Sequence, residues 1–177
     1  MNKILVTYAT RAGSTFEVAS LVAEVLRTAG ATVDVKYVRA VRELKDYDAV
    51  VIGSAIRMGQ WLPEAVEFVK TNRETLSHIP TAYFLVSGFL RKDTPEMRQR
   101  ALAYLDPART MLEPISIGLF AGKMDYSTMD WYDRSIAEAV SSSEGDWRNW
   151  EAIRSWAHDL LPAFSRVIAS QSQGAEV

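Results

Sequence analysis

Residues 10–15 carry the side chains best suited to binding an anion. The segment combines hydroxyl groups, a glycine and an arginine between an apolar run and a helical pattern. Gly13 permits a turn that a Cβ would hinder, and the N–H groups at a helix N-terminus attract negative charge. Arg11 supplies a further positive charge. The residues predicted to hold a phosphate monoester are Thr10, Arg11, Ala12, Gly13, Ser14 and Thr15.

A second interpretation of this loop needs no ligand. Ser14 and Glu17 have the spacing of a capping box, in which case Gly13 only turns the chain. Other phosphate sites fit less well, because the nucleoside-triphosphate loop and the dinucleotide fingerprint are absent. A phosphoacceptor domain needs carboxylates at its strand ends, and residues 7–9 and 53–55 include none.

Alternating strand-like and helical patterns place this loop in a parallel α/β fold. Short apolar runs predict strands, and apolar residues at helical spacing predict helices. Asn149 is expected to cap the last helix, and Pro162 to kink or stop it. The expected strands are residues 3–8, 32–37, 48–54, 81–87 and 114–121, and the expected helices are 14–29, 62–76, one from Thr94 and Pro95, and one after Asn149.

This order predicts a doubly wound sheet of five parallel strands with helices on both faces. The ligand is expected beyond the carboxyl ends of the strands. We predict a single domain over residues 1–165 and a flexible tail over 166–177. Residues 122–148 are polar and aromatic and too long for an ordinary connection, so they are expected to form an insert near the ligand.

The composition argues against several classes of binding and catalytic chemistry. The chain has 177 residues, a formal charge of −2 and no apolar run that could span a membrane, which argues against nucleic-acid binding and stable membrane insertion. Met1–Lys3 lead straight into the first strand, so no signal peptide and a cytoplasmic location are expected. With no Cys and two His, disulfides, thiolates and a metal site are not expected. Redox chemistry would need an organic cofactor.

The loop resembles the phosphate loop of the flavodoxins. Within that superfamily the chain is most similar to the flavodoxin-type, quinone-dependent protoporphyrinogen oxidases and their uncharacterised relatives, over residues 1–161. The resemblance implies a flavodoxin-like fold with strand order 2-1-3-4-5 and non-covalently bound FMN. The motifs that carry it are residues 8–15 (YATRAGST), 51–59 (VIGSAIRMG), 131–134 (WYDR) and 150–151 (WE).

By position in these motifs, two further loops are expected to enclose the isoalloxazine ring. Trp61 and Phe89 are the candidates to stack on it, although Trp61 also suits the apolar start of a helix. The expected ring-lining residues are Ser54, Ala55, Ile56, Arg57, Met58 and Gly59 on one side, and Ser87, Gly88, Phe89 and Leu90 on the other.

Charge favours an enzyme over a carrier. A guanidinium at Arg57 near the ring would stabilise the reduced anion and raise its potential, although Arg57 also suits an exposed loop. Residues 1–124 carry a net +3 and residues 125–177 a net −5, so the flavin-bearing part is not strongly acidic. We therefore expect an FMN-dependent oxidoreductase acting between an organic substrate and a quinone-like acceptor. The alternatives are an electron carrier that docks on redox proteins, and a flavin-free scaffold.

The insert departs from the pattern of the membrane-associated oxidases of this group, which carry a long, basic and apolar insert. Residues 135–146 are short and acidic, so anionic lipid is expected to repel them. Trp131 and Tyr132 suit either a platform for a planar substrate or the anchoring of this loop.

Overall fold

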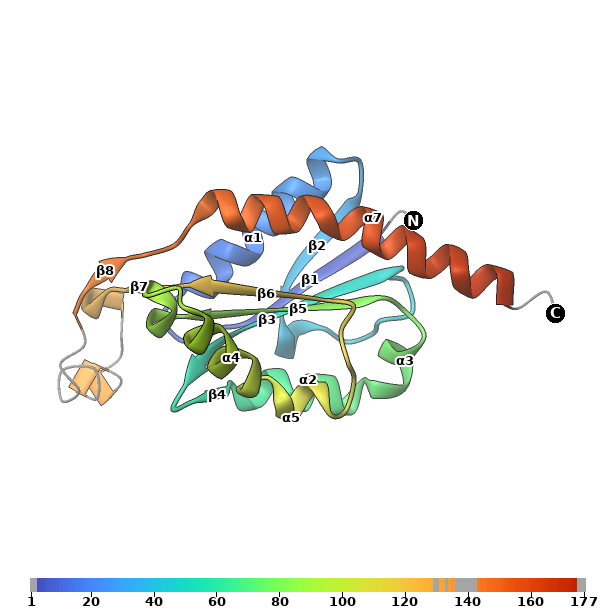
Figure 1. Cartoon of the computed structure of the whole chain (residues 1–177). Helices are drawn as coiled ribbons and strands as arrows, with labels where there is room; N and C mark the ends of the chain where they lie inside the picture. Colours follow the sequence, from blue (N-terminus) through green and yellow to red (C-terminus); the bar gives the residue numbers. More distant parts are fainter. Residues whose placement is uncertain (1–2, 129–130, 133, 136–142, 175–177) are drawn as a thin grey trace.

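A computed structural model gives the fold of the chain (Figure 1). It describes residues 3–128, 131–132, 134–135 and 143–174, with the backbone alone for 172–174. The main sheet contains β1 (Lys3–Ala9), β2 (Thr32–Tyr37), β3 (Ala49–Arg57), β4 (Gln60–Trp61), β5 (Thr81–Ser87) and β6 (Ser116–Ala121). The helices are α1 (Ser14–Thr28), α2 (Pro63–Thr71), α3 (Arg73–Ser77), α4 (Pro95–Ala103), α5 (Asp106–Arg109) and α7 (Trp150–Gly174). Shorter elements are η1 (Val38–Ala40), η2 (Gly88–Arg91), η3 (Tyr126–Thr128), β7 (Lys123–Met124) and β8 (Gly145–Asp146).

The main strands run parallel in the order β2-β1-β3-β5-β6. Because β6 is the fifth of the strands expected from the sequence, the predicted order 2-1-3-4-5 is confirmed. In β1, Val6 lies opposite Val35 of β2 on one side and Val51 of β3 on the other. The chain thus changes direction across the sheet at β1 and β3, which is where open α/β sheets bind their ligands.

Two apolar layers hold the helices to the sheet. Successive side chains of a strand point to opposite faces. Ile4 and Val6 pack into the cluster that includes α1 and α7, whereas Leu5 packs into the cluster that includes α2 and α3. Accordingly, α1 and α7 lie on one side of the sheet and α2, α3 and α5 on the other (Figure 1). Burial on both faces explains why the central strands are apolar throughout.

Gly53 in β3 allows close packing beneath α7. A Cβ at this position would lie 1.8 Å from Cζ of Phe84 on the neighbouring β5. Phe84 is fully buried, and its ring centroid lies 6.1 Å from that of Trp156 in α7. The missing side chain therefore makes room for the aromatic cluster that packs α7 against the sheet.

The helix predicted over residues 62–76 is divided into α2 and α3. Leu62 has an extended backbone (φ −57°, ψ 136°), so α2 begins at Pro63, which tolerates the first helical position because it needs no N–H there. Asn72 ends α2, and its Nδ2 donates to the carbonyl of Phe68 at 2.9 Å. This side-chain bond competes with continued helix at that point.

The last helix continues further than the sequence suggests. Asn149 caps it as predicted, with Oδ1 accepting the Ala152 N–H at 3.0 Å. However, α7 does not stop at Pro162 but runs to Gly174, so residues 166–174 of the expected tail are helical. Phe164, beyond the proline, is fully buried in the core. Packing of this residue offsets the hydrogen bond that Pro162 cannot make.

Arg148 joins three elements at the start of α7. Only 4% of its side chain is exposed. Its guanidinium pairs with Glu17 of α1 at 2.8 Å and with Asp146 of β8 at 2.6 Å, and lies 4.4 Å from the ring centroid of Trp150. These contacts fix the returning end of the insert against the first turn of α1.

The expected insert, residues 122–148, turns back on itself. β7 pairs with β8 in antiparallel fashion, with Lys123 opposite Asp146 and Met124 opposite Gly145. Much of the acidic stretch, residues 136–142, lies outside the described residues. Among the helices that are described, none combines the length and apolar character needed to cross a bilayer.

Candidate cofactor site

A cavity of about 340 Å³ opens at the carboxyl ends of β1, β3, β5 and β6. Its size falls within the usual range for a small-molecule site. Three of the segments around it are those predicted from the sequence, and the fourth follows β6. The lining residues are Thr10, Arg11, Ala12, Ser14, Ala55, Ile56, Arg57, Leu62, Val86, Ser87, Gly88, Gly122, Lys123, Met124 and Thr128.

The loop between β1 and α1 has an open anion-binding geometry. Gly13 adopts a left-handed conformation with φ +87°, and its N–H donates to Thr10 Oγ1 at 3.0 Å. Gly13 is the N-cap of α1, which begins at Ser14, so Ser14 lies one position too late to act as the capping residue. The capping box of Ser14 and Glu17 is therefore not formed, and the first N–H groups of α1 remain suited to an anion.

Thr15 provides a direct test of whether a phosphate fits here. Its side chain is fully buried, and Oγ1 has no hydrogen-bond partner in the structure. A buried hydroxyl without a partner is costly and rare in folded proteins. A phosphate oxygen held by the loop would supply the missing partner, so the residues present fit the terminal phosphate of a mononucleotide.

Arg11 is arranged differently from the sequence-based expectation. It lines the cavity, but its guanidinium forms a two-pronged ion pair with Glu64 of α2, in which Nη2 and Oε2 are 3.0 Å apart. Tyr37, at the end of β2, donates to Oε1 of the same carboxylate at 3.0 Å. The charge expected to face a phosphate is thus directed to a carboxylate, and Arg11 braces the loop.

Glu64 is the centre of this brace and was not found by the sequence analysis. Only 4% of its side chain is exposed. Burial alone would raise the pKa of Glu64, but hydrogen bonds from Arg11, from its own backbone N–H and from Tyr37 lower the pKa to about 2. The carboxylate therefore remains charged, and it links the loop after β1 to β2 and α2.

The loop after β3 divides the predicted residues into two groups. Ala55, Ile56 and Arg57 line the cavity, whereas the buried Ser54 accepts the Leu62 N–H at 3.1 Å and donates to the Ala55 carbonyl at 2.8 Å. Ser54 therefore supports the loop from behind.

The other two residues predicted in this loop form its turn. Met58 (φ +51°) and Gly59 (φ +73°) connect β3 to β4. Arg57 at the end of β3 pairs with Gln60 at the start of β4. Neither lines the cavity, and Met58 is 88% exposed. The hairpin presents Arg57 at the cavity and Met58 to solvent.

The loop after β5 is divided in a similar way. Ser87 and Gly88 line the cavity, Phe89 packs against Tyr104 with ring centroids 5.5 Å apart, and Leu90 is buried in the core. Trp61 is 2% exposed and packs against the ring of Tyr83. Neither proposed stacking residue, Trp61 nor Phe89, lines this cavity.

The segment after β6 completes the cavity, and the sequence analysis placed it only near the ligand. Gly122 donates its N–H to the Ser87 carbonyl at 3.2 Å, which joins two of the cavity loops. Lys123 pairs with Asp125 at 2.9 Å, and Met124 and Thr128 also contribute to the lining. The sequence does contain a signal for this segment, because the carboxyl ends of all the parallel strands, including the last, lie at the same edge of the sheet.

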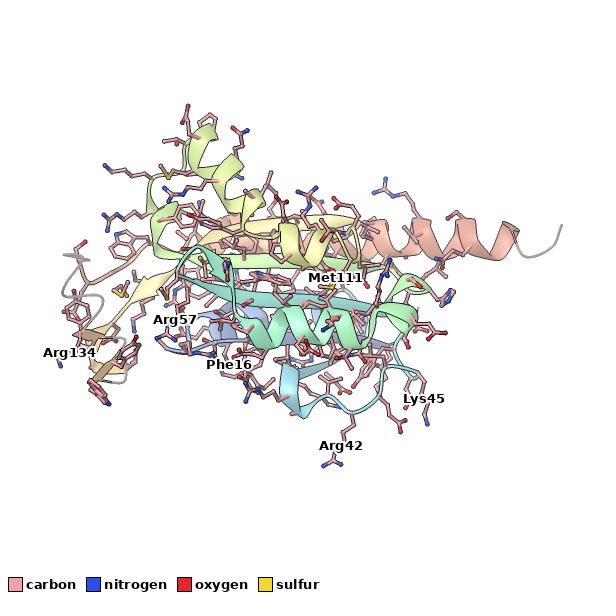
Figure 2. The ribbon with its side chains drawn as sticks, turned by 90° about the horizontal axis from the view of Figure 1, so that it is seen from below. Phe16, Arg42, Lys45, Arg57, Met111 and Arg134 are labelled. Carbon is pink, nitrogen blue, oxygen red and sulfur yellow. The ribbon has the colours of Figure 1, made fainter. Side chains whose placement is uncertain are left out.

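Arg57 lies beneath the insert. Its Cζ is 5.5 Å from the ring centroid of Tyr132, and Figure 2 shows Arg57 at the same end of the molecule as Arg134 of the insert. Tyr132 is 52% exposed and Trp131 80% exposed, so neither forms part of the core. The contact with Arg57 is consistent with an anchoring role for Tyr132.

The cavity has a positive lining. Arg11, Arg57 and Lys123 line it, and none of the described lining residues is acidic, although Glu64 and Asp125 pair with Arg11 and Lys123 from outside the lining. In the part of the chain that the structure describes, no three His, Asp or Glu side chains gather as a metal centre would require.

A parallel sheet of this order, with an anion-binding loop and a cavity at its switch point, defines a doubly wound mononucleotide-binding protein. Comparisons extend this. Residues 5–149 match the flavodoxin-domain family. The protoporphyrinogen IX dehydrogenase (quinone) of Escherichia coli K12 is 31% identical over 172 residues, which cover 89% of this chain and 94% of that protein. The chain therefore belongs to the flavodoxin-domain family, and its cofactor is the flavin FMN.

Solved structures agree on the fold. The flavodoxin of Streptococcus pneumoniae TIGR4 matches with a TM-score of 0.57 and 15% identity, over 90% of this chain and 98% of that one. The rubredoxin oxygen:oxidoreductase of Desulfovibrio gigas matches with a TM-score of 0.53 and 17% identity, over 96% of this chain. The chain spans 37% of the length of the latter protein.

Proposed function

We propose that the protein is an FMN-dependent oxidoreductase that passes electrons between an organic substrate and a quinone. The observation that carries this proposal is the position of Arg57, which lines the cavity beside the expected ring, while no acidic residue is among the described lining residues. Positive charge beside the ring favours uptake of an electron pair, whereas carboxylates would oppose it. The name of the E. coli relative supports a quinone as the acceptor and a tetrapyrrole such as protoporphyrinogen as the donor.

In this proposal each loop has a separate task. The N–H groups of Ala12, Ser14 and Thr15 and the hydroxyl of Thr15 bind the phosphate, and Glu64 holds the loop in shape through Arg11. Ala55–Arg57 lie along one side of the ring and Ser87 and Gly88 along the other. Bound FMN supplies electron transfer, and Arg57 stabilises the negative charge that the ring gains.

The experiment uses protein purified with one equivalent of FMN. We expect it to oxidise protoporphyrinogen with menadione as the acceptor. We also expect Arg57→Gln to lower the midpoint potential by about 30 mV, which corresponds to about 1.4 kcal/mol for two electrons. Arg42→Gln is the matched control, because Arg42 is exposed and lies away from Arg57 (Figure 2), and it should leave the potential unchanged.

One result would contradict the proposal, and a second would exclude protoporphyrinogen as the substrate. Loaded protein that reduces a redox protein but not menadione would be an electron carrier. Loaded protein that reduces menadione without oxidising protoporphyrinogen would have another donor. We expect no stimulation by anionic vesicles, because residues 135–146 are acidic, and a large stimulation would show that this argument from charge is wrong.

A further inference from the structure

A second cavity, of about 400 Å³, adjoins the cofactor cavity. The two cavities share four lining residues, so a molecule in the second cavity would lie next to a cofactor in the first. The shared residues are Ile56, Ser87, Gly88 and Met124, and the second cavity adds Phe89, Arg91, Lys92, Met97, Ser143 and Trp147.

The apolar side of this second cavity is firmly held. The Trp147 N–H donates to the Gly122 carbonyl at 3.2 Å, and a Cβ at Gly145 would lie 2.6 Å from the Trp147 ring. Phe89 is fixed edge-on against Tyr104. Together with two methionine side chains, these rings form a wall suited to a flat, apolar molecule.

The polar side of the cavity is cationic. The Arg91 Cζ lies 5.5 Å from the Trp147 ring centroid, and its Nη1 donates to Ser143 Oγ at 3.2 Å. Within the described part of the chain, neither Arg91 nor Lys92 contacts a carboxylate, and no acidic residue lines the cavity. The adjacent Asp93 does not neutralise them, since it pairs with Arg98 at 2.6 Å.

We propose that this second cavity binds the organic substrate and selects a flat, apolar molecule that carries a carboxylate. The rings of Phe89 and Trp147 contact its body, and Arg91 and Lys92 bind its carboxylate. The inference rests on the proposed function, because the shared wall then places the substrate beside the flavin. A neutral quinone lacks the group that these cations bind, so the cavity discriminates between the two reactants.

The test compares two probes of nearly the same shape, one anionic and one neutral. Binding of 2-naphthoate and of its neutral analogue 2-naphthamide is measured by calorimetry on FMN-loaded, oxidised protein, in which the cofactor occupies the first cavity. We expect naphthoate to bind more tightly. The double variant Arg91→Gln/Lys92→Gln should weaken naphthoate binding about tenfold and leave naphthamide binding unchanged, because it removes charge-assisted hydrogen bonds. Arg42→Gln should change neither.

Methionine methyl groups locate the bound probe independently of any variant. With ¹³C-labelled methionine, naphthoate should shift the Met97 and Met124 signals and not that of Met111, which lies away from Arg57 and this end of the molecule (Figure 2). Equal affinity for the two probes, or shifts that do not include Met97, would overturn the proposal.

The outcomes separate the two proposals. Loaded protein that oxidises protoporphyrinogen but shows no preference for naphthoate would retain the proposed function and lose the substrate cavity. Selective naphthoate binding that depends on Arg91 and Lys92, in protein without menadione reductase activity, would support the anion-selective cavity and remove the quinone-dependent function.

Discussion

The hydroxyl of Thr15 should affect the protein in opposite directions with and without its cofactor. Thr15→Val keeps the shape of the side chain and removes a buried Oγ1 that has no partner. In the apoprotein we expect the free energy of unfolding to stay constant or rise by about 1 kcal/mol. The affinity for FMN should fall about tenfold, because a donor to the phosphate is lost. Urea unfolding of the apoprotein and FMN titration measure the two effects.

Thr7 is the matched control for this substitution. It is equally buried, but its Oγ1 donates to the Lys36 carbonyl at 2.9 Å. Thr7→Val should therefore destabilise the apoprotein by about 1 kcal/mol and spare FMN affinity. If the two variants behave alike, Thr15 does not contact the phosphate.

Glu64 makes stability depend on acidity. Its pKa is about 2 in the folded protein against an ordinary value of 4.5. A lowered pKa stabilises the fold above the ordinary value, and this contribution is lost as the pH falls from about 4.5 towards 2. Between about pH 6 and pH 3, the free energy of unfolding should fall more in the wild type than in Glu64→Gln. Urea titrations at both pH values give this difference. An equal decrease in the free energy of unfolding of the two proteins would show that Glu64 does not brace the loop as a charged group.

The loop of residues 10–15, which lines the cavity, can be predicted as a candidate site from neighbouring residues, but the ion pair that braces it cannot. Residues 10–15 can be recognised as a candidate anion site because hydroxyl side chains and a glycine occur within one short segment. Arg11 and Glu64 are 53 positions apart, and their pairing depends on how α2 packs beside β1. Local spacing holds no information about such a contact, so the sequence alone predicts that Arg11 binds the phosphate.

At the level of elements, the packing of β3 against β5 leaves no room for a side chain at Gly53. Gly53→Ala would place a Cβ against the buried Phe84 ring, and the displaced ring must move towards α7. We expect destabilisation by about 1–3 kcal/mol, measured by urea unfolding of the apoprotein. Gly88→Ala is the control, since its Cβ would meet Trp147 at 3.9 Å, an ordinary contact. A loss of similar size in both variants would mean that crowding at Phe84 is not the cause.

Element positions were predicted where a repeating pattern exists. The parallel strands and α1 follow apolar periodicity, and their order is confirmed. β4 was missed because its turn places Met58, a residue with no turn preference, at positive φ. The extent of α7 beyond Pro162 was missed because burial of Phe164 overrides the local effect of proline.

For the whole molecule, cofactor binding and folding should be linked. FMN at about 100 times its dissociation constant should raise the free energy of unfolding by about 2.7 kcal/mol, or Tm by about 5–10 °C. Riboflavin at the same concentration should give a smaller shift, because it lacks the phosphate that we propose residues 10–15 bind. Calorimetric scans of the apoprotein with each compound test this, and equal shifts would place the phosphate elsewhere.

The pairing of β7 with β8 has a consequence for how the segment that joins these two strands can change. Met124 and Gly145 lie side by side, so the ends of the segment between them are already held together. Closing a flexible loop costs little more when it is longer, about 0.6 kcal/mol for each doubling of its length. Segments of very different size and charge can therefore be exchanged beyond Thr128 at almost constant stability. Such a replacement should leave the cavity-lining loops after β1, β3 and β5 in place.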